Sequence, residues 1–283
     1  RSIHFISLSA PAVYNRKNYN IGMVSQFQQA GYNLNSFDLA FGGNIPASGL
    51  SSSAALSVAI GTALTAVFNL NISKKSIVLY AQKSEHLFAG VKCGIMDPYA
   101  SAFGIKDRAL LLDCRTNTHI EVEADFGDFS LLLVNSKVKH NLAESAYNKR
   151  REACEESVDL LKSSYPGALT LRDIPMEDLE RVKQILPAQL FPKAKHVITE
   201  INRVKLASDA LKNNEIHAFG ELLKDSHRSL SQDFEVSCAE LDFLAEQSWK
   251  MPGVIGSRMM GGGFGGCTIN LISNAHLEKF QSE

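Results

Sequence analysis

Residues 44–68 read NIPASGLSSSAALSVAIGTALTAVF, and the rest of the chain is organised around them. A loop that ends near Gly49 leads into three consecutive serines at 51–53, which an apolar, alanine-rich segment follows from Ala54 to Phe68. Because this segment is apolar on nearly every side, it predicts a buried helix. Its length of about 15 residues falls short of the roughly 20 that a membrane-spanning helix needs.

The three serines, Ser51, Ser52 and Ser53, lie where this helix is expected to begin. The first backbone N–H groups of a helix lack partners, and the aligned peptide dipoles add partial positive charge there. A loop followed by such a terminus is typical of an anion site, most often for phosphate. One serine would serve as an ordinary helix cap, but three in succession favour the phosphate site. The stretch is not a Walker A loop, because it contains no lysine.

The composition is that of an ordinary globular chain, with 283 residues, 45% hydrophobic residues and a net charge of -1. This length predicts one large domain or two modest ones. The charge argues against a nucleic-acid or membrane partner that depends on a broad basic surface. The five cysteines are widely spaced and show no zinc-binding pattern, which favours a reducing, cytosolic setting. We find no signal peptide or transmembrane run, and the first residue, Arg1, suggests that the natural start is missing.

Hydrophobic spacing and turn residues predict the secondary structure. Helices are expected at 18–30, 74–88, 144–163, 176–186, 193–212, 215–225 and 239–250. Strands are expected at 37–41, 109–113, 119–123 and 129–135, with the last of these beginning a second structural unit. His227 and Arg228, in the polar stretch after 215–225, are interpreted as structural residues.

Two acidic residues stand out. Glu85 falls in the last turn of the helix that Ser73 caps, where a carboxylate faces the negative end of the helix dipole; a plain surface glutamate is the alternative. Asp97 lies between apolar segments and is expected to be partly buried, and buried acids pair, bind metal or carry out proton chemistry. The alternative is that Asp97 caps a helix that has Pro98 at its first position. The buried face of the helix that contains Glu85 is expected to include Ile77, Tyr80, Ala81 and Leu87.

Residues 253–271, GVIGSRMMGGGFGGCTINL, form the second glycine-rich feature. Gly261, Gly263 and Gly266 formally match GxGxxG, but a dinucleotide site needs a helix after the glycines. The alternating residues 267–271 predict a strand instead, so we expect a strand, a glycine loop and a second strand. The glycines indicate close approach of the backbone to a ligand or another loop, and a plain hairpin is the alternative.

Three segments, PASGLSSSAA, EHLFAGVKCGIMD and SRMMGGGFGGCTINL, follow one another in the order and spacing of one family. The chain resembles the GHMP kinases and, within them, the galactokinases, through nearly its whole length. The resemblance implies an α+β, two-domain fold with the active site in the interdomain cleft, a nucleotide domain at 1–125 and a C-terminal domain at 126–283. It also implies transfer of phosphate from ATP to the anomeric hydroxyl of α-D-galactose, with Mg²⁺ as cofactor.

The resemblance gives each matching residue a role. The loop around the ATP phosphates would comprise Ala47, Ser48, Gly49, Leu50, Ser51, Ser52 and Ser53. Ser53 and Glu85 would bind Mg²⁺, and Asp97 would be the catalytic residue, as general base or as charge partner of the sugar hydroxyl. Besides Asp97, the sugar would contact Cys93, Gly94 and Tyr147. The glycine loop that shapes the active site would comprise Gly261, Gly262, Gly263, Gly265 and Gly266.

The early arginine and Glu-His…Asp sugar-binding set of the galactokinases are not found in these residues. We therefore expect the chain to begin after them and to lack part of the family's C-terminus. Alternatives that stay open are a kinase for N-acetylgalactosamine or arabinose and a non-catalytic sugar sensor on the same fold. The expected partners are a small-molecule sugar and ATP, without nucleic acid or membrane. We expect a cytoplasmic monomer.

Overall fold

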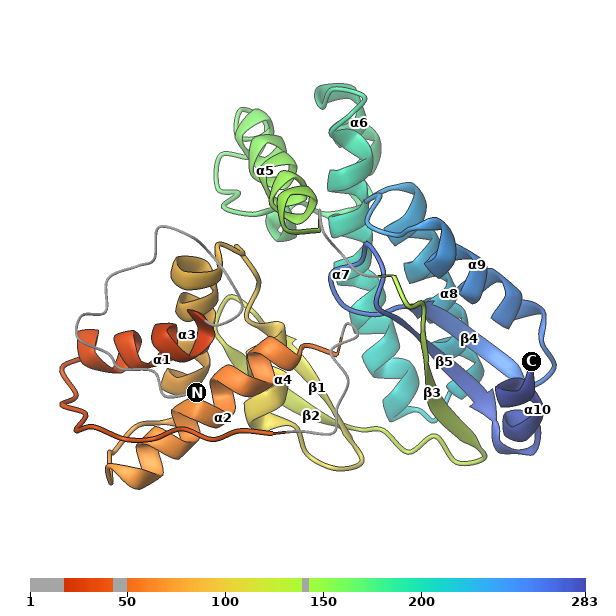
Figure 1. Cartoon of the computed structure of the whole chain (residues 1–283). Coiled ribbons are helices and arrows are strands. Elements are labelled where there is room, and N and C mark those ends of the chain that lie inside the picture. Colours follow the sequence, from red (N-terminus) through yellow and green to blue (C-terminus); the bar gives the residue numbers. More distant parts are fainter. Residues whose placement is uncertain (1–17, 43–49, 139–142) are drawn as a thin grey trace. The chain divides into compact units, whose positions relative to one another are not determined.

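The computed structural model describes residues 18–42, 50–138 and 143–283. The chain forms two compact units, which divide between Glu121 and Val122. Each unit combines helices with a small sheet, two-stranded in the first unit and three-stranded in the second (Figure 1). In the described ranges, no helix is both long enough and apolar enough to cross a membrane.

The first unit consists of four α-helices, one π-helical turn and a pair of strands within its described residues. In chain order these are α1 (Asn18–Gln29), α2 (Ser52–Val67), α3 (Lys74–Ser84), the π-helix η1 (Glu85–Ala89), α4 (Met96–Phe103), β1 (Arg108–Asp113) and β2 (Thr118–Glu123). The predicted strands at 109–113 and 119–123 and the predicted helix at 18–30 are confirmed. Ser73 caps α3 as predicted, because its side chain accepts a hydrogen bond from the Ser76 N–H.

The core of this unit lies between α1, α2 and α3. Met23 and Phe27 on α1 are fully buried there, against Leu64 of α2 and Ile77 of α3. Gly61 lets α2 approach α3, since a Cβ at this position would lie 2.7 Å from the Cγ2 of Ile77. The burial of these side chains fixes the packing of the three helices.

Three expectations for this unit are wrong. Helix α2 is buried on one side only: Ala55, Ala59, Thr62, Ala63, Ala66 and Val67 are exposed. Residues 37–41 form no strand, because alternation cannot supply a neighbouring strand to pair with, and Phe37 packs edge-on against Phe68 instead. Leu87 is exposed and Phe88 is buried, because the wider π-helical turn shifts which side chain faces the core.

The second unit is mostly helical around an antiparallel sheet. Its elements are β3 (Phe129–Asn135), α5 (Ala143–Leu161), η2 (Leu171–Asp173), η3 (Met176–Asp178), α6 (Leu179–Ile185), α7 (Phe191–Lys212), α8 (Ile216–Gln232), α9 (Ala239–Lys250), β4 (Val254–Met259), β5 (Cys267–Ser273), η4 (Asn274–His276) and α10 (Leu277–Ser282). Strand β3 and helix α9 have the predicted bounds.

The sheet has the order β3-β5-β4, so the central strand is β5. Leu132 pairs with Asn270 on one side, and Arg258 pairs with Ile269 on the other. Helices α8 and α9 both pack against β4 (Figure 1). The predicted strand, glycine loop and strand at 253–271 are therefore confirmed, with β4 and β5 on either side of the loop.

Helix α8 runs to Gln232, beyond the predicted end at residue 225. The polar stretch after residue 225, which was expected to lie outside the helix, forms the last two turns of α8. Several of its polar side chains point into the protein. Ser226 donates a hydrogen bond to Glu200 on α7, and Ser229 donates to Asp233. These contacts satisfy polar groups that the sequence pattern alone marks as solvent-facing.

His196 on α7 is buried in this polar layer. Its Nδ1 lies 3.0 Å from the Oγ of Ser229, and its ring stacks on Phe234 with centroids 4.6 Å apart. Burial, followed by the charge of Arg203, lowers the pKa of His196 to about 4, against an opposing effect of Asp233. The folded protein therefore keeps this ring neutral at pH 7.

The low pKa of His196 makes stability depend on pH. In the unfolded chain the ring binds a proton below its ordinary pKa of 6.5, whereas in the folded chain it does so only below about 4. Between these values the unfolded state binds more protons, so lowering the pH from 6.5 to 4 should reduce the free energy of unfolding by about 3 kcal/mol through this group. Denaturant unfolding across this range, followed by the fluorescence of Trp249, measures the loss.

His196→Gln keeps a hydrogen-bond donor but cannot titrate, so its unfolding free energy should fall less steeply over the same range. Burial also lowers the pKa of His227, which adds to the slope in both proteins and cancels in the comparison. Equal slopes for the two proteins would show that His196 does not contribute.

Candidate active site

The serine run opens helix α2. Ser51 precedes the helix in a left-handed conformation, with φ 52°, and its side chain makes no capping hydrogen bond to the described backbone. Ser51 therefore does not act as an ordinary side-chain cap of α2 within the described residues. Ser52 is exposed, and Ser53, like Leu50, is half-buried. The first N–H groups of α2 thus lack a side-chain cap from Ser51, as an anion-binding helix terminus requires.

The other residues predicted for this loop, Ala47, Ser48 and Gly49, lie outside the described residues. Their role in enclosing phosphate stays a prediction.

Glu85 lies at the junction between α3 and the π-helix η1. The residue is 8% exposed, and its Oε1 has no hydrogen-bond partner among the described residues. A buried carboxylate oxygen without a partner is costly, because desolvation is not repaid. π-Helical turns are frequent at functional sites, and this orphaned acceptor fits a cation ligand better than the alternative of a surface glutamate.

Cys93 and Asp97 lie close to this carboxylate. The pKa of the Cys93 thiol is raised above its ordinary value, mainly by burial, then by the charge of Glu85 and a hydrogen bond to it, and then by the charge of Asp97. Both carboxylates therefore lie within electrostatic range of the Cys93 thiol in the first unit. Gly94 is exposed, with no atom within 4 Å of where its Cβ would lie.

Asp97 is half-buried, as the sequence predicted, but it does not cap the helix. Helix α4 begins at Met96 after Ile95, so Asp97 lies inside the first turn and Pro98 follows it there. The capping alternative is therefore wrong by two residues. The placement leaves the Asp97 carboxylate in the first turn of the helix, near the positive end of the helix dipole.

No group of three or more His, Cys, Asp or Glu side chains in the described ranges could hold a metal ion. Mg²⁺ does not need such a cage, because it binds through one or two carboxylates together with water and phosphate oxygens. The orphaned oxygen of Glu85 and the hydroxyl of Ser53 are donors of the oxygen type that Mg²⁺ prefers. The residues present fit a phosphate-bound Mg²⁺ and do not fit a metal held by protein alone.

The glycine loop and Tyr147 lie in the second unit. A Cβ at Gly263, which has φ 85°, would overlap the carbonyl oxygen of Val236, and the Phe264 N–H donates to that same oxygen at 2.6 Å. A Cβ at Gly262 would lie 3.6 Å from the ring of Tyr147 near the start of α5. The structure thus places Tyr147 beside the glycine loop, and close backbone packing explains why the loop needs Gly263.

The positive φ angles of Gly261, Gly265 and Gly266 belong to the same loop. Because β4 and β5 pair antiparallel on either side of this loop, the segment also forms the hairpin that was the alternative.

The interpretation of His227 and Arg228 as structural is consistent with their contacts. The Met259 N–H donates to the Nδ1 of the buried His227, and Arg228 lies over the ring of Trp249. His227 therefore supports the end of β4 just before the glycine loop, while its Nε2 lies 3.2 Å from Asp242.

The sequence reasoning missed Gln82 and His86. The Nε2 of Gln82 lies 3.2 Å from the carbonyl oxygen of Cys93, and the Nε2 of His86 lies 2.8 Å from the same oxygen. The available signal was the spacing of these two residues and Glu85, at i, i+3 and i+4 on one helix face.

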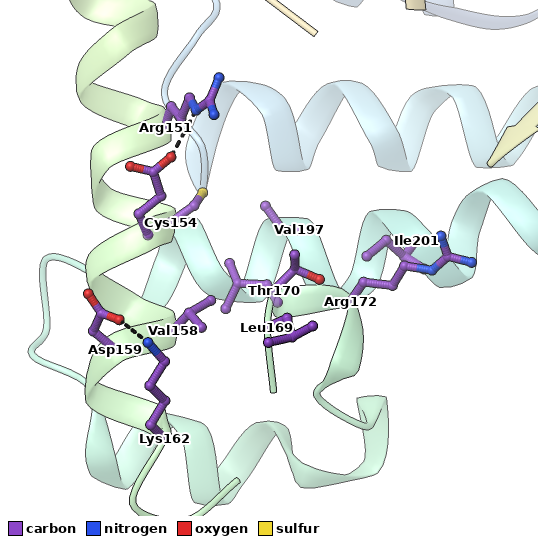
Figure 2. A pocket seen from close by; sticks show the side chains of 12 residues that line it. Arg151, Cys154, Val158, Asp159, Lys162, Leu169, Thr170, Arg172, Val197 and Ile201 are labelled. Carbon is purple, nitrogen blue, oxygen red and sulfur yellow. Dashed lines mark hydrogen bonds and ion pairs between the residues drawn. The ribbon is translucent and has the colours of Figure 1, made fainter. Parts of the chain in front are cut away.

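A cavity of about 350 Å³, which none of these residues lines, lies between α5, η2 and α7 of the second unit (Figure 2). Its floor includes Val158 and Leu171, and its charged side chains are engaged: Arg151 pairs with Glu155, Lys162 pairs with Asp159, and Arg172 has an interaction as well. This cavity offers no uncommitted charged group and contains no predicted site residue.

Comparison with known proteins identifies the family. The GHMP kinases N terminal domain matches residues 18–105, which contain Ser51–Ser53, Glu85 and Asp97. The GHMP kinases C terminal model matches residues 207–283, which contain the glycine loop. Tyr147 lies between the two matches.

Galactokinase of Clostridium perfringens is 41% identical over 269 residues, which are 94% of this chain and 69% of that protein. Galactokinase of Fusobacterium nucleatum is 38% identical over 275 residues, with 95% and 71% of the two chains covered.

The structure superposes on Lactococcus lactis galactokinase complexed with galactose, with a TM-score of 0.92 and 32% identity, over 99% of this chain and 73% of that one. L. major mevalonate kinase, with 18% identity and a TM-score of 0.57 over 95% and 73% of the chains, shares the fold alone. The sequence resemblance and the α+β, two-domain fold class are both confirmed: the chain belongs to the galactokinases of the GHMP kinase family.

Proposed function

We propose that this protein transfers the γ-phosphoryl group of ATP to the anomeric hydroxyl of α-D-galactose and releases galactose 1-phosphate and ADP. The observation that carries the proposal is the 41% identity to a galactokinase over 94% of this chain, with Ser51–Ser53, Glu85 and Asp97 all inside the matched N-terminal domain. One carboxylate has an oxygen open to a cation, and the second lies at a helix N-terminus. Phosphoryl transfer needs such positioning and charge stabilisation more than covalent chemistry.

The roles of the residues follow from their places. Ser51, Ser52 and Ser53, with the first N–H groups of α2, bind phosphate oxygens through the positive end of the helix dipole. Asp97 accepts a hydrogen bond from the sugar hydroxyl, orients it and takes its proton as the oxygen bonds to phosphorus. Mg²⁺, when held by Glu85 and Ser53, supplies positive charge to the phosphate oxygens.

The second unit contributes the glycine loop and Tyr147. We assign to Tyr147 a hydrogen bond to the sugar, and to Gly261–Gly266 a close backbone surface, because the loop tolerates no side chain at Gly263. Cys93 and Gly94 lie in the same loop that precedes Asp97, and we place them near the sugar. The cytoplasmic location and the monomeric state stay predictions from the sequence.

The direct test is an ADP-release assay with Mg-ATP and a panel of galactose, N-acetylgalactosamine, arabinose and glucose. We expect turnover with galactose at least about a hundred-fold above the other sugars in kcat/KM, since a site that hydrogen-bonds a sugar rejects analogues that leave its polar groups unpaired. Preferential turnover of another sugar would support the kinase reaction but would identify that sugar, rather than galactose, as the substrate. Nucleotide binding without turnover of any sugar would favour a sensor.

Asp97→Asn should lower kcat by about 10² to 10⁴, because a positioned proton acceptor contributes about this factor. ADP binding, measured by equilibrium dialysis, should change little, since Asp97 acts on the sugar. Asp107→Asn is the matched control: it removes the same charge in the same unit, from a side chain that is 77% exposed. Near-normal kcat in Asp97→Asn would exclude the catalytic role.

Glu85→Gln keeps the shape of the side chain and removes its charge, so the Mg²⁺ concentration for half-maximal rate should rise about ten-fold or more. KM for galactose should stay within about two-fold. Glu121→Gln, at an exposed position of the same unit, is the control and should leave the Mg²⁺ dependence unchanged. An unaltered Mg²⁺ titration in Glu85→Gln would remove this residue from the metal site.

A further inference from the structure

The connection between α8 and α9, residues 233–238, is held by one arginine from α5. The Nε of Arg150 donates to the carbonyl oxygen of Phe234 at 2.6 Å, and its Nη2 donates to the carbonyl oxygen of Glu235 at 3.1 Å. The Nη2 also lies 3.3 Å from the Oε2 of Glu235. Because the side chain of Arg150 is only 22% exposed, these contacts are partly shielded from water. One planar guanidinium thus fixes two successive carbonyl groups of the connection.

The next carbonyl of the same connection supports the glycine loop. The carbonyl oxygen of Val236 accepts a hydrogen bond from the Phe264 N–H at 2.6 Å, and a Cβ at Gly263 would overlap this oxygen. Val236 is buried, and its own N–H donates to the carbonyl oxygen of Leu230 at 3.0 Å. The glycine loop therefore rests on a backbone oxygen that directly follows the two carbonyl groups held from α5.

Helix α5 also approaches the glycine loop directly. Tyr147 lies three residues before Arg150, and this spacing places the two side chains on one face of the helix. A Cβ at Gly262 would lie 3.6 Å from the ring of Tyr147. The contacts therefore form a closed ring, which runs from α5 through the connection to the glycine loop and back to α5 at Tyr147.

We propose that Arg150 is a positioning residue, which fixes the glycine loop relative to Tyr147 by holding the carbonyl groups of the α8–α9 connection. The inference rests on the proposed function, in which Tyr147 donates a hydrogen bond to the sugar and the glycine loop forms a close backbone surface. Arg150 has no contact with the sugar in this arrangement. Its effect on sugar binding acts through Tyr147 and the loop.

The chemistry of the contact explains why an arginine is needed. The guanidinium carries several N–H donors in a rigid plane, whereas a lysine has one ammonium group and cannot span two carbonyl groups in the same way. Lys193 on α7 also reaches the connection, with its Nζ 2.9 Å from the Oε2 of Glu235. That contact is to the side chain, so it does not replace the two backbone contacts of Arg150.

The first test needs no substrate. Arg150→Met keeps an apolar stem and removes every donor, and amide hydrogen exchange reports how often the loop opens. We expect exchange in peptides that cover residues 260–266 to become about ten-fold faster than in the wild type, since hydrogen bonds from a charged group are lost. Exchange in strand β3, residues 129–135 of the same unit, should increase less. Arg150→Lys should give a rate between those of Arg150→Met and the wild type.

The second test is a double-mutant cycle in the kinase assay. Arg150→Met should raise KM for galactose about ten-fold, while the affinity for ADP, which is placed at the phosphate site of the first unit, should change less than about two-fold. Added to Tyr147→Phe, the same substitution should raise KM by less than about three-fold, because residues that act through one another are not additive. A residue with a merely structural role would multiply KM by the same factor in both backgrounds.

Arg151→Met is the matched control, since it makes the same change one residue further along α5. Arg151 pairs with Glu155 on its own helix and not with the α8–α9 connection. This variant should leave both loop exchange and KM for galactose as in the wild type. Should Arg150→Met not fold, Arg150→Lys replaces it, with an expected increase in loop exchange of about three-fold.

Unchanged exchange in residues 260–266 would overturn the proposal. An equal increase in strand β3 would also overturn it, because it would show general destabilisation. So would independent factors in the cycle with Tyr147→Phe, because they would show that Arg150 does not act through Tyr147. If the wild-type protein phosphorylates no galactose, the proposed function fails separately, while hydrogen exchange still decides whether Arg150 holds the glycine loop.

Discussion

A buried carboxylate with one unpartnered oxygen, on Glu85, is the constraint on which the arrangement of the first unit's site depends. Such a group is unfavourable unless something compensates for lost hydration. The π-helical turn that begins at Glu85 sets the direction of this side chain, and His86 in the same turn holds the carbonyl oxygen of Cys93 at 2.8 Å. The Oε1 of Glu85 has no partner among the described residues, and for this reason we assign a cation to this point.

The second unit contributes to the proposed site mainly through the backbone of its glycine loop. The loop from Gly261 to Gly266 must pass against the carbonyl of Val236, and Met259 before it is anchored by His227. A rigid backbone surface costs little reorganisation when a ligand arrives. The buried polar layer around His196 and Glu200 lies between α7 and α8, and α8 packs against β4. This layer therefore supports the glycine loop indirectly, through β4.

Hydrophobic periodicity and the residues at element ends predicted a helix or strand correctly where the tertiary contacts of that segment agreed with its local pattern. Helix α9 and strand β3 have the predicted bounds for that reason. The pattern failed where a tertiary partner decides: residues 37–41 alternate like a strand but have no strand beside them, and α8 continues through a polar stretch because Ser226 and Ser229 bond inward. Residue type and spacing drew attention to the serine run and Asp97, whereas the metal-binding role of Glu85 came from the family resemblance, and all of these roles stay predictions. For Gln82 and His86 the shared helix face was the one available signal, and it does not reveal that both side chains reach the carbonyl of Cys93, because any residue can supply a carbonyl.

Several departures from local rules fall at residues assigned to the site, although left-handed non-glycine residues such as Lys137 and Glu235 also lie elsewhere. Ser51 takes a left-handed conformation that non-glycine residues rarely adopt, the helix widens at Glu85, and Phe264 is left-handed within the glycine loop. Each departure costs free energy that the surrounding core must supply, of order 1–3 kcal/mol for a strained backbone position. Strain at positions where a ligand is proposed to bind, as at Ser51, is expected when binding rather than folding determines the local conformation.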